Sequence, residues 1–183
     1  MDFTDILKEL KDGENMGGLP QKFYFGYQAD VGTWPAKPVA PILTMEAAGK
    51  LTGDLLMKVG KRMFEFYFTD DTGEFKIEPV GEMDGKSFIL RLTIFHPGLS
   101  AKIFGFMNAA KNDNLVLIVP DNNGNMYVMG DALRPAIYSG APDGAGTGKE
   151  TAGRRGISME FTYKTSNLYV YTGSIPLTVA VEP

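Results

Sequence analysis

The sequence predicts a mainly β protein of the α+β class, an antiparallel β-sandwich or open barrel with one flanking α-helix. Three observations predict this fold: apolar residues alternate with polar ones in several runs, turn-forming residues separate those runs, and one central segment has helical spacing. The chain has 183 residues, a length typical of one domain. We expect residues 1–20 to form an N-terminal arm and residues 21–183 to form a single β-rich domain.

The first expected element is a short amphipathic helix over residues 3–11, within the arm. Phe3, Ile6, Leu7 and Leu10 follow the i, i+3, i+4, i+7 spacing of one apolar stripe. The glycines and the proline that come next end this helix.

An aromatic run and a proline-rich connector follow the arm. The run that starts at Lys22 reads KFYFGYQ and is rich in residues that favour strands. Three prolines then fall within residues 31–41, and each removes a backbone donor and fixes φ. We therefore expect residues 31–41 to form an extended connector rather than a central strand.

The next runs predict a strand and a hairpin. Residues 50–60 read as a strand punctuated by glycine. Phe64, Phe66 and Phe68 then alternate with other residues, which places three phenylalanines on one face. The sequence DDTG that follows is a turn signal, so we expect this strand to form a hairpin with residues 74–79.

Further strands are expected on both sides of one helix. Residues 87–95 alternate, with Phe88, Leu90, Leu92 and Ile94 expected to face inward. Ser100 is a plausible N-cap for a helix over residues 100–110, whose apolar stripe is formed by Ile103, Phe106, Met107 and Ala110.

The last third of the chain predicts the remaining strands. Residues 115–119 (LVLIV) are uninterrupted apolar residues, which indicates a strand covered on both faces. The turn sequence DNNGN after them predicts a hairpin with residues 126–129. Residues 157–164 and 175–182 alternate again and are expected to be strands.

Composition excludes several classes of function. A net charge of −4 and a pI near 5.1 argue against a nucleic-acid-binding surface, which needs clustered Lys and Arg. The absence of cysteine rules out disulfides, thiolate metal ligands and a thiol nucleophile. The single histidine, His96, is expected in a turn rather than at a metal. We predict no metal and no cofactor.

The sequence predicts neither export nor a membrane partner. The N-terminus carries acidic residues where a signal peptide needs basic ones, and no stretch approaches the roughly 20 apolar residues of a membrane span. We expect the protein to be made in the cytoplasm and used without Sec export.

The glycine-rich stretch GAPDGAGTGKET, residues 140–151, looks at first like a phosphate-binding loop. The template places Asp143 at its first glycine and Glu150 at its magnesium-binding hydroxyl, and both carboxylates would repel a polyphosphate. A catalytic acid pair, either Asp70 with Asp71 or Asp121 with Asp131, is better explained by turn formation. We therefore predict that the protein is not an enzyme.

Two features are left without a structural explanation. The segment 139–156 is glycine-rich and carries Lys149, Arg154 and Arg155, which suits salt bridges to acidic groups of a neighbouring subunit. Separately, Trp34 and Tyr24 could line a sugar-binding platform, as in a monomeric carbohydrate-binding β-sandwich, although aromatic residues at strand spacing are usually core.

The order of these features resembles the tail tube (major tail) proteins of bacteriophages, most closely those of phages and prophages of Bacteroidetes-type hosts. The pattern covers residues 40–175: the glycine-punctuated strand, the alternating hairpins, the helix after His96-Pro97-Gly98, the apolar strand before Asp121, the basic loop and the final Tyr171-Thr172-Gly173 strand. The type VI secretion tube protein shares the fold of that family.

The resemblance implies a structural virion protein located in the tail. Such subunits assemble into hexameric rings, whose inner strands close a continuous β-barrel around a channel, and the rings stack through loops and terminal arms. It implies that the partners are further copies of this chain and other tail proteins, with DNA passing through without specific binding. In that setting Lys149, Arg154 and Arg155 would lie at a joint between subunits.

Overall fold

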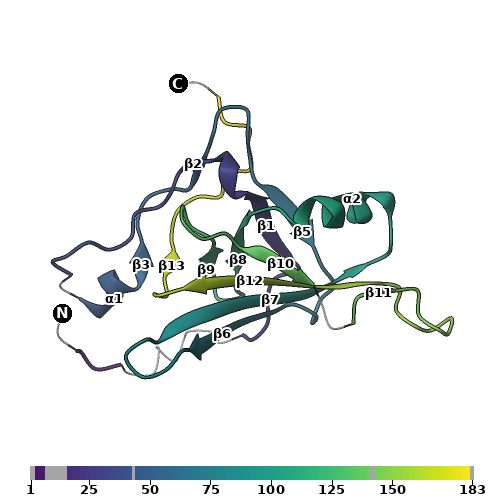
Figure 1. Cartoon of the computed structure of the whole chain (residues 1–183), viewed down its shortest axis with the longest axis horizontal. Helices are drawn as coiled ribbons and strands as arrows, with labels where there is room; N and C mark the ends of the chain where they lie inside the picture. Colours follow the sequence, from purple (N-terminus) through teal and green to yellow (C-terminus); the bar gives the residue numbers. More distant parts are fainter. Residues whose placement is uncertain (1–2, 7–15, 43, 141–142, 182–183) are drawn as a thin grey trace.

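Two β-sheets packed face to face make up most of the computed structural model, which describes residues 3–6, 16–42, 44–140 and 143–181 (Figure 1). The fold is mainly β with two short helices, and no sheet closes into a barrel among these residues. The predicted fold class is confirmed. No described helix has the length and apolar character that a bilayer span requires.

One sheet has six strands and carries the aromatic run. In spatial order its strands are β3 (Lys50–Leu51), β13 (Val170–Tyr171), β9 (Met126–Met129), β8 (Leu115–Pro120), β1 (Lys22–Tyr27) and β5 (Phe64–Tyr67). All neighbours are antiparallel except β13 and β3. The central strand β8 is therefore flanked by β9 and β1, as expected for an uninterrupted apolar run.

The other sheet is built on two long strands that cross below the first sheet in Figure 1. In spatial order its strands are β10 (Ile137–Gly140), β12 (Gly156–Thr165), β7 (Ser87–Pro97) and β6 (Glu74–Val80), with β11 (Ala145–Gly146) also paired to β12. All pairings are antiparallel, and β7 and β12 are in register from Phe88 with Thr165 to Pro97 with Gly156.

Short elements complete the fold. A 3-10 turn η1 (Gln28–Asp30) precedes the connector, which begins with strand β2 (Val31–Thr33), paired with β4 (Leu56–Met57). A one-turn helix α1 (Met45–Ala48), absent from the sequence expectations, begins after Thr44, whose hydroxyl accepts a hydrogen bond from the Ala47 amide at 3.1 Å. Beyond β2, the connector pairs only through an isolated bridge of Ala36 with Thr52 among the described residues, so it is a connector rather than a central strand, as predicted.

Helix α2 (Ala101–Ala110) confirms the expected flanking helix. The Ser100 hydroxyl accepts a hydrogen bond from the Ile103 amide, so this residue is the predicted N-cap. Ile103 and Ala110 are buried, and Phe106 and Met107 pack beside them. The helix lies at one side of the sandwich in Figure 1 and closes that end of the core.

Two buried clusters lie on opposite faces of the six-stranded sheet. The sandwich core lies between the two sheets and α2, and consists of Leu19, Phe23, Phe66, Phe68, Leu90, Leu92, Ile94, Ile103, Ala110, Leu115, Leu117, Val119, Met129, Ala136, Ile157, Met159, Phe161 and Tyr163. The connector-side core lies on the other face, and consists of Tyr24, Val31, Leu51, Leu55, Met57, Met63, Val116, Ile118 and Tyr171. Strand β8 contributes to both cores, which confirms the prediction that it is covered on both faces.

The predicted hairpin between residues 64–69 and 74–79 is wrong, because the two strands belong to different sheets. β5 pairs with β1, opposing Phe23 to Phe66, whose rings stack at 5.0 Å. The chain then changes sheet within two residues: the Phe68 amide donates to Gln21 of the β1 side, and the Thr69 amide donates to Phe95 of β7. The turn residues determine that the chain reverses direction, but they do not determine which strand β5 pairs with. Aromatic cross-strand contacts stabilise the pairing of β5 with β1.

Two other strand predictions are wrong. Residues 50–60 form β3 and β4 with an irregular turn between them, where Gly53 has a φ of 83° and the Asp54 carboxylate accepts a bond from the Ser174 amide at 2.7 Å. The described part of residues 175–182 forms no strand, although it bonds to residues 60–63 through the Met63 amide and through Ala180. Alternation alone does not make a strand here, because Leu177, Val179 and Val181 are exposed and the apolar side of the segment is not buried.

The N-terminal helix prediction is not borne out where it can be compared. Residues 3–6 are described and are not helical, while residues 7–11 lie outside the described residues. Phe3 and Ile6 are 91% and 83% exposed, so the expected apolar stripe has no buried face in this part of the chain.

Candidate functional site

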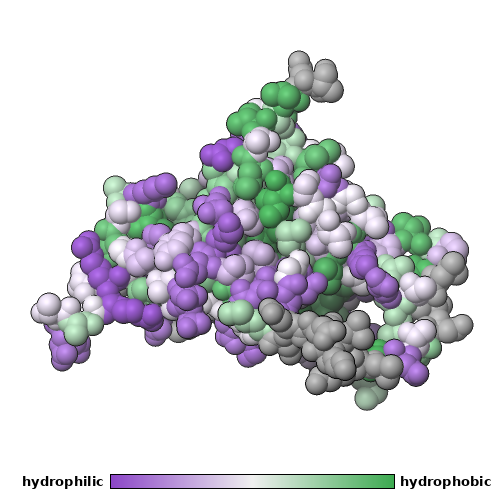
Figure 2. Space-filling view, turned by 180° about the vertical axis from the view of Figure 1, so that it is seen from behind, coloured by the Kyte–Doolittle hydropathy of each residue, from purple (hydrophilic) through white to green (hydrophobic). Residues whose placement is uncertain are grey.

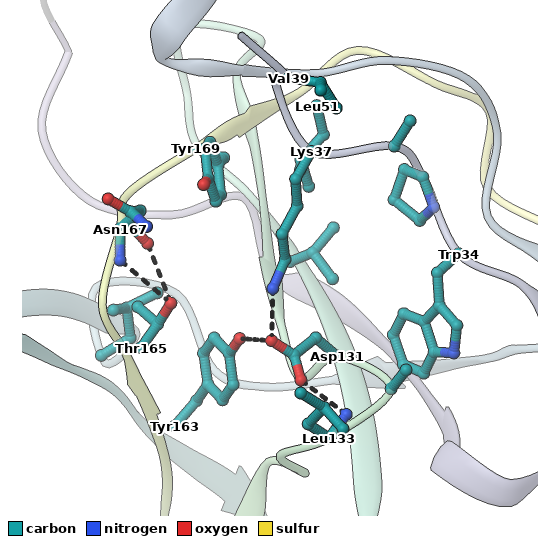
Figure 3. Close-up of a pocket in the computed structure, with 16 residues that line it drawn as sticks. Trp34, Lys37, Val39, Leu51, Asp131, Leu133, Tyr163, Thr165, Asn167 and Tyr169 are labelled. Carbon is teal, nitrogen blue, oxygen red and sulfur yellow. Dashed lines mark hydrogen bonds and ion pairs between the residues drawn. The ribbon is translucent and has the colours of Figure 1, made fainter.

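A cavity of about 460 Å³ lies on the connector side of the molecule (Figure 3). Three segments supply most of its lining, namely the connector, the turn that follows β9, and the chain from the end of β12 to Tyr169, and Leu51, Leu90 and Val128 complete it. Its labelled side chains in Figure 3 are Trp34, Lys37, Val39, Leu51, Asp131, Leu133, Tyr163, Thr165, Asn167 and Tyr169. The cavity therefore exists only because distant parts of the sequence meet.

A hydrogen-bonded carboxylate, that of Asp131, lines the cavity. Asp131 Oδ2 receives the Lys37 ammonium at 2.7 Å and the Tyr163 hydroxyl at 3.0 Å. Its other oxygen, Oδ1, accepts bonds from the Leu133 and Arg134 amides, both at 2.8 Å. The side chain of Asp131 is 18% exposed, so a charge there requires these partners.

The electrostatics of this carboxylate follow from two opposed effects. Burial raises the pKa of Asp131, and the hydrogen bonds from Lys37, from the two backbone amides and from Tyr163 lower it. The hydrogen bonds outweigh burial, so the pKa lies below its usual value and the group is ionised at neutral pH. Burial raises the pKa of Tyr163 to about 12, so this phenol stays protonated and acts as a donor.

The backbone around Gly130 shapes the floor of the cavity. Gly130 has a φ of 117°, a conformation that L-residues rarely adopt, and a Cβ at this position would lie 3.2 Å from the Leu115 carbonyl oxygen. The chain turns here from β9 into residues 131–134, where the Asp131 amide bonds the Arg134 carbonyl at 2.7 Å. This turn directs the Asp131 side chain towards Lys37 and Tyr163.

The structure does not bring Trp34 and Tyr24 together in the alternative sugar-binding platform, and Tyr24 is a core residue, as aromatic residues at strand spacing usually are. Trp34 lines the cavity, but Tyr24 is 7% exposed and lies in the connector-side core beneath it. The second aromatic wall comes instead from Tyr163 and Tyr169. Sequence spacing could not indicate this, because more than 120 residues separate Trp34 from either tyrosine.

Two of the three basic residues of segment 139–156 contact other parts of the described chain. The Arg154 guanidinium lies over the Phe95 ring at 4.3 Å, and Arg155 donates to the Leu99 carbonyl at 3.2 Å. Lys149 makes no hydrogen bond or ion pair with any described residue. The segment contains regular structure, because β11 pairs with the start of β12. The excursion of the chain around β11 extends past the end of the sheet in Figure 1.

The structure does not support a nucleotide-binding loop at residues 140–151. Within residues 140–151 the described part forms β11 and a turn, with no helix to present its N-terminus to a phosphate. Residues 141 and 142 lie outside the described residues.

The candidate acid pairs and the histidine have structural roles. Asp121 and Asp131 lie at opposite ends of β9, so the structure does not bring them together. Asp121 caps its hairpin turn by accepting bonds from the Asn123 and Asn125 amides. His96 lies in β7 rather than in a turn, where its Nδ1 is 2.9 Å from the Tyr67 carbonyl oxygen.

No metal site emerges from the described residues. They contain no group of three or more His, Cys, Asp or Glu side chains placed to hold a metal ion. The carboxylate of Asp131 is held by four donors: the Lys37 ammonium, the Tyr163 hydroxyl and two backbone amides. This arrangement is suited to binding a ligand, through the aromatic and amide groups that surround the Lys37–Asp131 ion pair.

Comparison with known proteins gives this chain no relative: no protein-family model, curated protein or solved structure matches it.

Proposed function

We propose that this protein is a structural subunit that assembles with copies of itself into stacked hexameric rings, forming a tube of the kind found in phage tails, through which DNA passes. The observation that carries the proposal is the five-stranded sheet, whose outermost strands β6 and β10 pair with no further strand among the described residues. Edges of this kind are a hazard in a monomer and a joint in a ring, where each edge pairs with a neighbour.

The side chains of this sheet suit a surface that stays in water while its edges pair. Its outer face carries an ion-pair network in which Arg91 contacts Glu78 at 3.1 Å and Glu160 at 3.0 Å. The edge strand β6 presents Glu74, Lys76 and Glu78, charges that restrict pairing to a complementary edge. The net charge of −4 also suits a conduit for DNA, because an acidic wall does not retain a polyanion.

A second surface supports self-association. The C-terminal segment and the turn at residues 58–61, joined by backbone hydrogen bonds, form a projection at the top of Figure 1. Figure 2 shows apolar residues gathered on it, and Val59, Val179 and Val181 are 58%, 53% and 80% exposed. Exposed apolar groups concentrated in one place are typical of contact surfaces.

Sedimentation velocity over a range of protein concentrations, with negative-stain electron microscopy, tests the proposal. We expect rings or tubes at high concentration. Ile137, which is 45% exposed on the edge strand β10, provides the edge variant: Ile137→Lys places a charge on the joint and should abolish rings while the subunit stays folded. Phe104→Lys, at an equally exposed position on helix α2, adds the same charge away from the sheet edge and serves as the control. A wild-type protein that stays monomeric, or an Ile137→Lys variant that assembles normally, contradicts the proposal.

The basic segment allows an independent test. Lys149 has no partner among the described residues, so Lys149→Glu changes the charge of the excursion without removing a contact within the chain. We expect it to weaken ring stacking, and the double change of Arg154 and Arg155 to Glu to weaken it further. Stacks of unchanged length in micrographs of both variants would remove these residues from the interface.

A further inference from the structure

The cavity of Figure 3 contains polar groups that no contact within the fold uses. The indole N–H of Trp34, the hydroxyl of Tyr169 and the side-chain oxygen of Asn167 make no hydrogen bond with any described residue. The backbone of Asn167 is held in place, because its N–H donates to the Thr165 hydroxyl at 3.4 Å and its carbonyl oxygen accepts from that hydroxyl at 3.0 Å. The cavity thus presents two donors and an acceptor on an otherwise apolar lining.

The charge inside the cavity is balanced. Lys37 is paired to Asp131, and the carboxylate already accepts bonds from four donors. An anionic ligand would have to draw Lys37 away from its partner, and a cationic ligand would find a carboxylate with no remaining capacity. The ligand that fits this balance is neutral.

The size and the lining narrow the chemistry further. A volume of about 460 Å³ lies within the range of small-molecule sites. Leu51, Leu90 and Val128 supply aliphatic walls beside the Trp34 ring. A ligand must therefore offer apolar faces together with several groups that both donate and accept hydrogen bonds, which describes the C–H faces and hydroxyls of a sugar ring.

We infer that this cavity binds a neutral pyranose sugar, with a C–H face of the ring against Trp34 and ring hydroxyls bonded to Tyr169 and Asn167. The bound sugar lies beside the Lys37–Asp131 pair, whose position is fixed by Tyr163. Sugar binding requires neither rings nor tubes, so it can be tested independently of the proposed self-association.

Trp34 is the only tryptophan in the chain, so its fluorescence reports on the cavity directly. We would titrate dilute, unassembled protein with D-glucose, D-galactose, D-mannose and N-acetyl-D-glucosamine up to about 50 mM, a range that covers dissociation constants on the order of 1 mM. Calorimetry repeats each titration without relying on the indole signal. We expect saturable binding of at least one of these sugars, and roughly tenfold weaker binding of glucuronate and glucosamine, because each carries a charge.

Two variants link binding to the cavity, and a third is their control. Asn167→Ala and Tyr169→Phe each remove one hydrogen-bonding group and should weaken binding by roughly tenfold. Tyr67→Phe removes a hydroxyl from a half-exposed tyrosine on β5 and should leave binding unchanged. Circular dichroism establishes that each variant is folded. Absence of saturable binding for all four sugars, or binding that Asn167→Ala and Tyr169→Phe leave unaltered, overturns the inference.

Discussion

The two faces of strand β8 contact two different kinds of core. Leu117 faces the sandwich core, which a second sheet and helix α2 cover. Its neighbour Ile118 faces the connector-side core, which is covered mainly by the connector, the irregular residues around Leu55 and the C-terminal segment. Both side chains are fully buried, and the cavity that contains Trp34 is lined from both cores, by Leu51 of the connector-side core and by Leu90 and Tyr163 of the sandwich core. The two cores therefore differ in the regularity of the segments that cover them.

The largest expected effect compares the two cores directly. Leu117→Ala and Ile118→Ala remove side chains of the same size from adjacent, fully buried positions. We expect Leu117→Ala to lower the free energy of unfolding by about 4 kcal/mol and Ile118→Ala by about 2 kcal/mol, because irregular segments can settle into a cavity more easily than two packed sheets. Urea unfolding measured by circular dichroism gives both values.

The control for this comparison is Met83→Ala. Met83 is 86% exposed in the turn between β6 and β7, and its replacement should change the free energy of unfolding by less than about 0.5 kcal/mol. Equal losses for Leu117→Ala and Ile118→Ala would mean that the two covers are equally rigid.

A smaller effect is expected from a single hydroxyl that stabilises the connector-side core. Tyr171 is 1% exposed, and its hydroxyl accepts the Leu55 amide at 2.8 Å and donates to the Ser174 carbonyl at 2.6 Å. Tyr171→Phe leaves both backbone groups without this partner and should lower the free energy of unfolding by roughly 1–3 kcal/mol. Tyr67→Phe, at a half-exposed position, is the matched control and should have little effect. An unchanged free energy of unfolding in Tyr171→Phe would show that water replaces the hydroxyl as the partner of these backbone groups.

The smallest effect concerns pH and the cavity carboxylate. The folded-state pKa of Asp131 is lowered, against the opposing effect of burial, by its hydrogen bonds with Lys37, Arg134, Leu133 and Tyr163. Its contribution to stability is therefore present above the unfolded-state pKa of about 3.9 and is lost as pH falls through the lower folded-state pKa.

Asp131→Asn isolates this contribution from those of other acidic groups with lowered pKa values, such as Glu78. We expect the difference in unfolding free energy between wild type and variant to be largest at neutral pH and to shrink steadily below about pH 4. Thermal unfolding measured at several pH values provides the comparison. A difference that stays constant down to pH 2 would mean that Asp131 acts through packing rather than through charge.

Much of the sandwich core was predictable from the pattern of residues. Leu90, Leu92 and Ile94 face inward on β7, as their alternation indicates, and Ile157, Met159 and Phe161 do so on β12. Each of these strands buries one face, so its buried residues recur at every second position of the sequence. Helix α2 was predictable for the same reason, with a period of 3.6 and a serine cap.

The connector-side core and the cavity could not be predicted in the same way. Trp34, Asp131 and Tyr163 lie in segments with no shared period, and each alone has an ordinary explanation as connector, turn or strand. Asp131 was noticed only as one member of an acid pair, and its actual partners, Lys37 and Tyr163, are 94 and 32 residues away.

The sequence by itself determined the local elements of this protein: the strands with a buried face, the helix, the β8–β9 hairpin and the acidic surface. Local patterns suffice there because backbone periodicity and turn chemistry act over a few residues. Only the tertiary structure decided that β5 and β6 join different sheets, that residues 175–181 form no strand, and that Lys37 meets Asp131. Those outcomes depend on which distant surfaces bury the most apolar area together, and no short stretch of sequence contains that information.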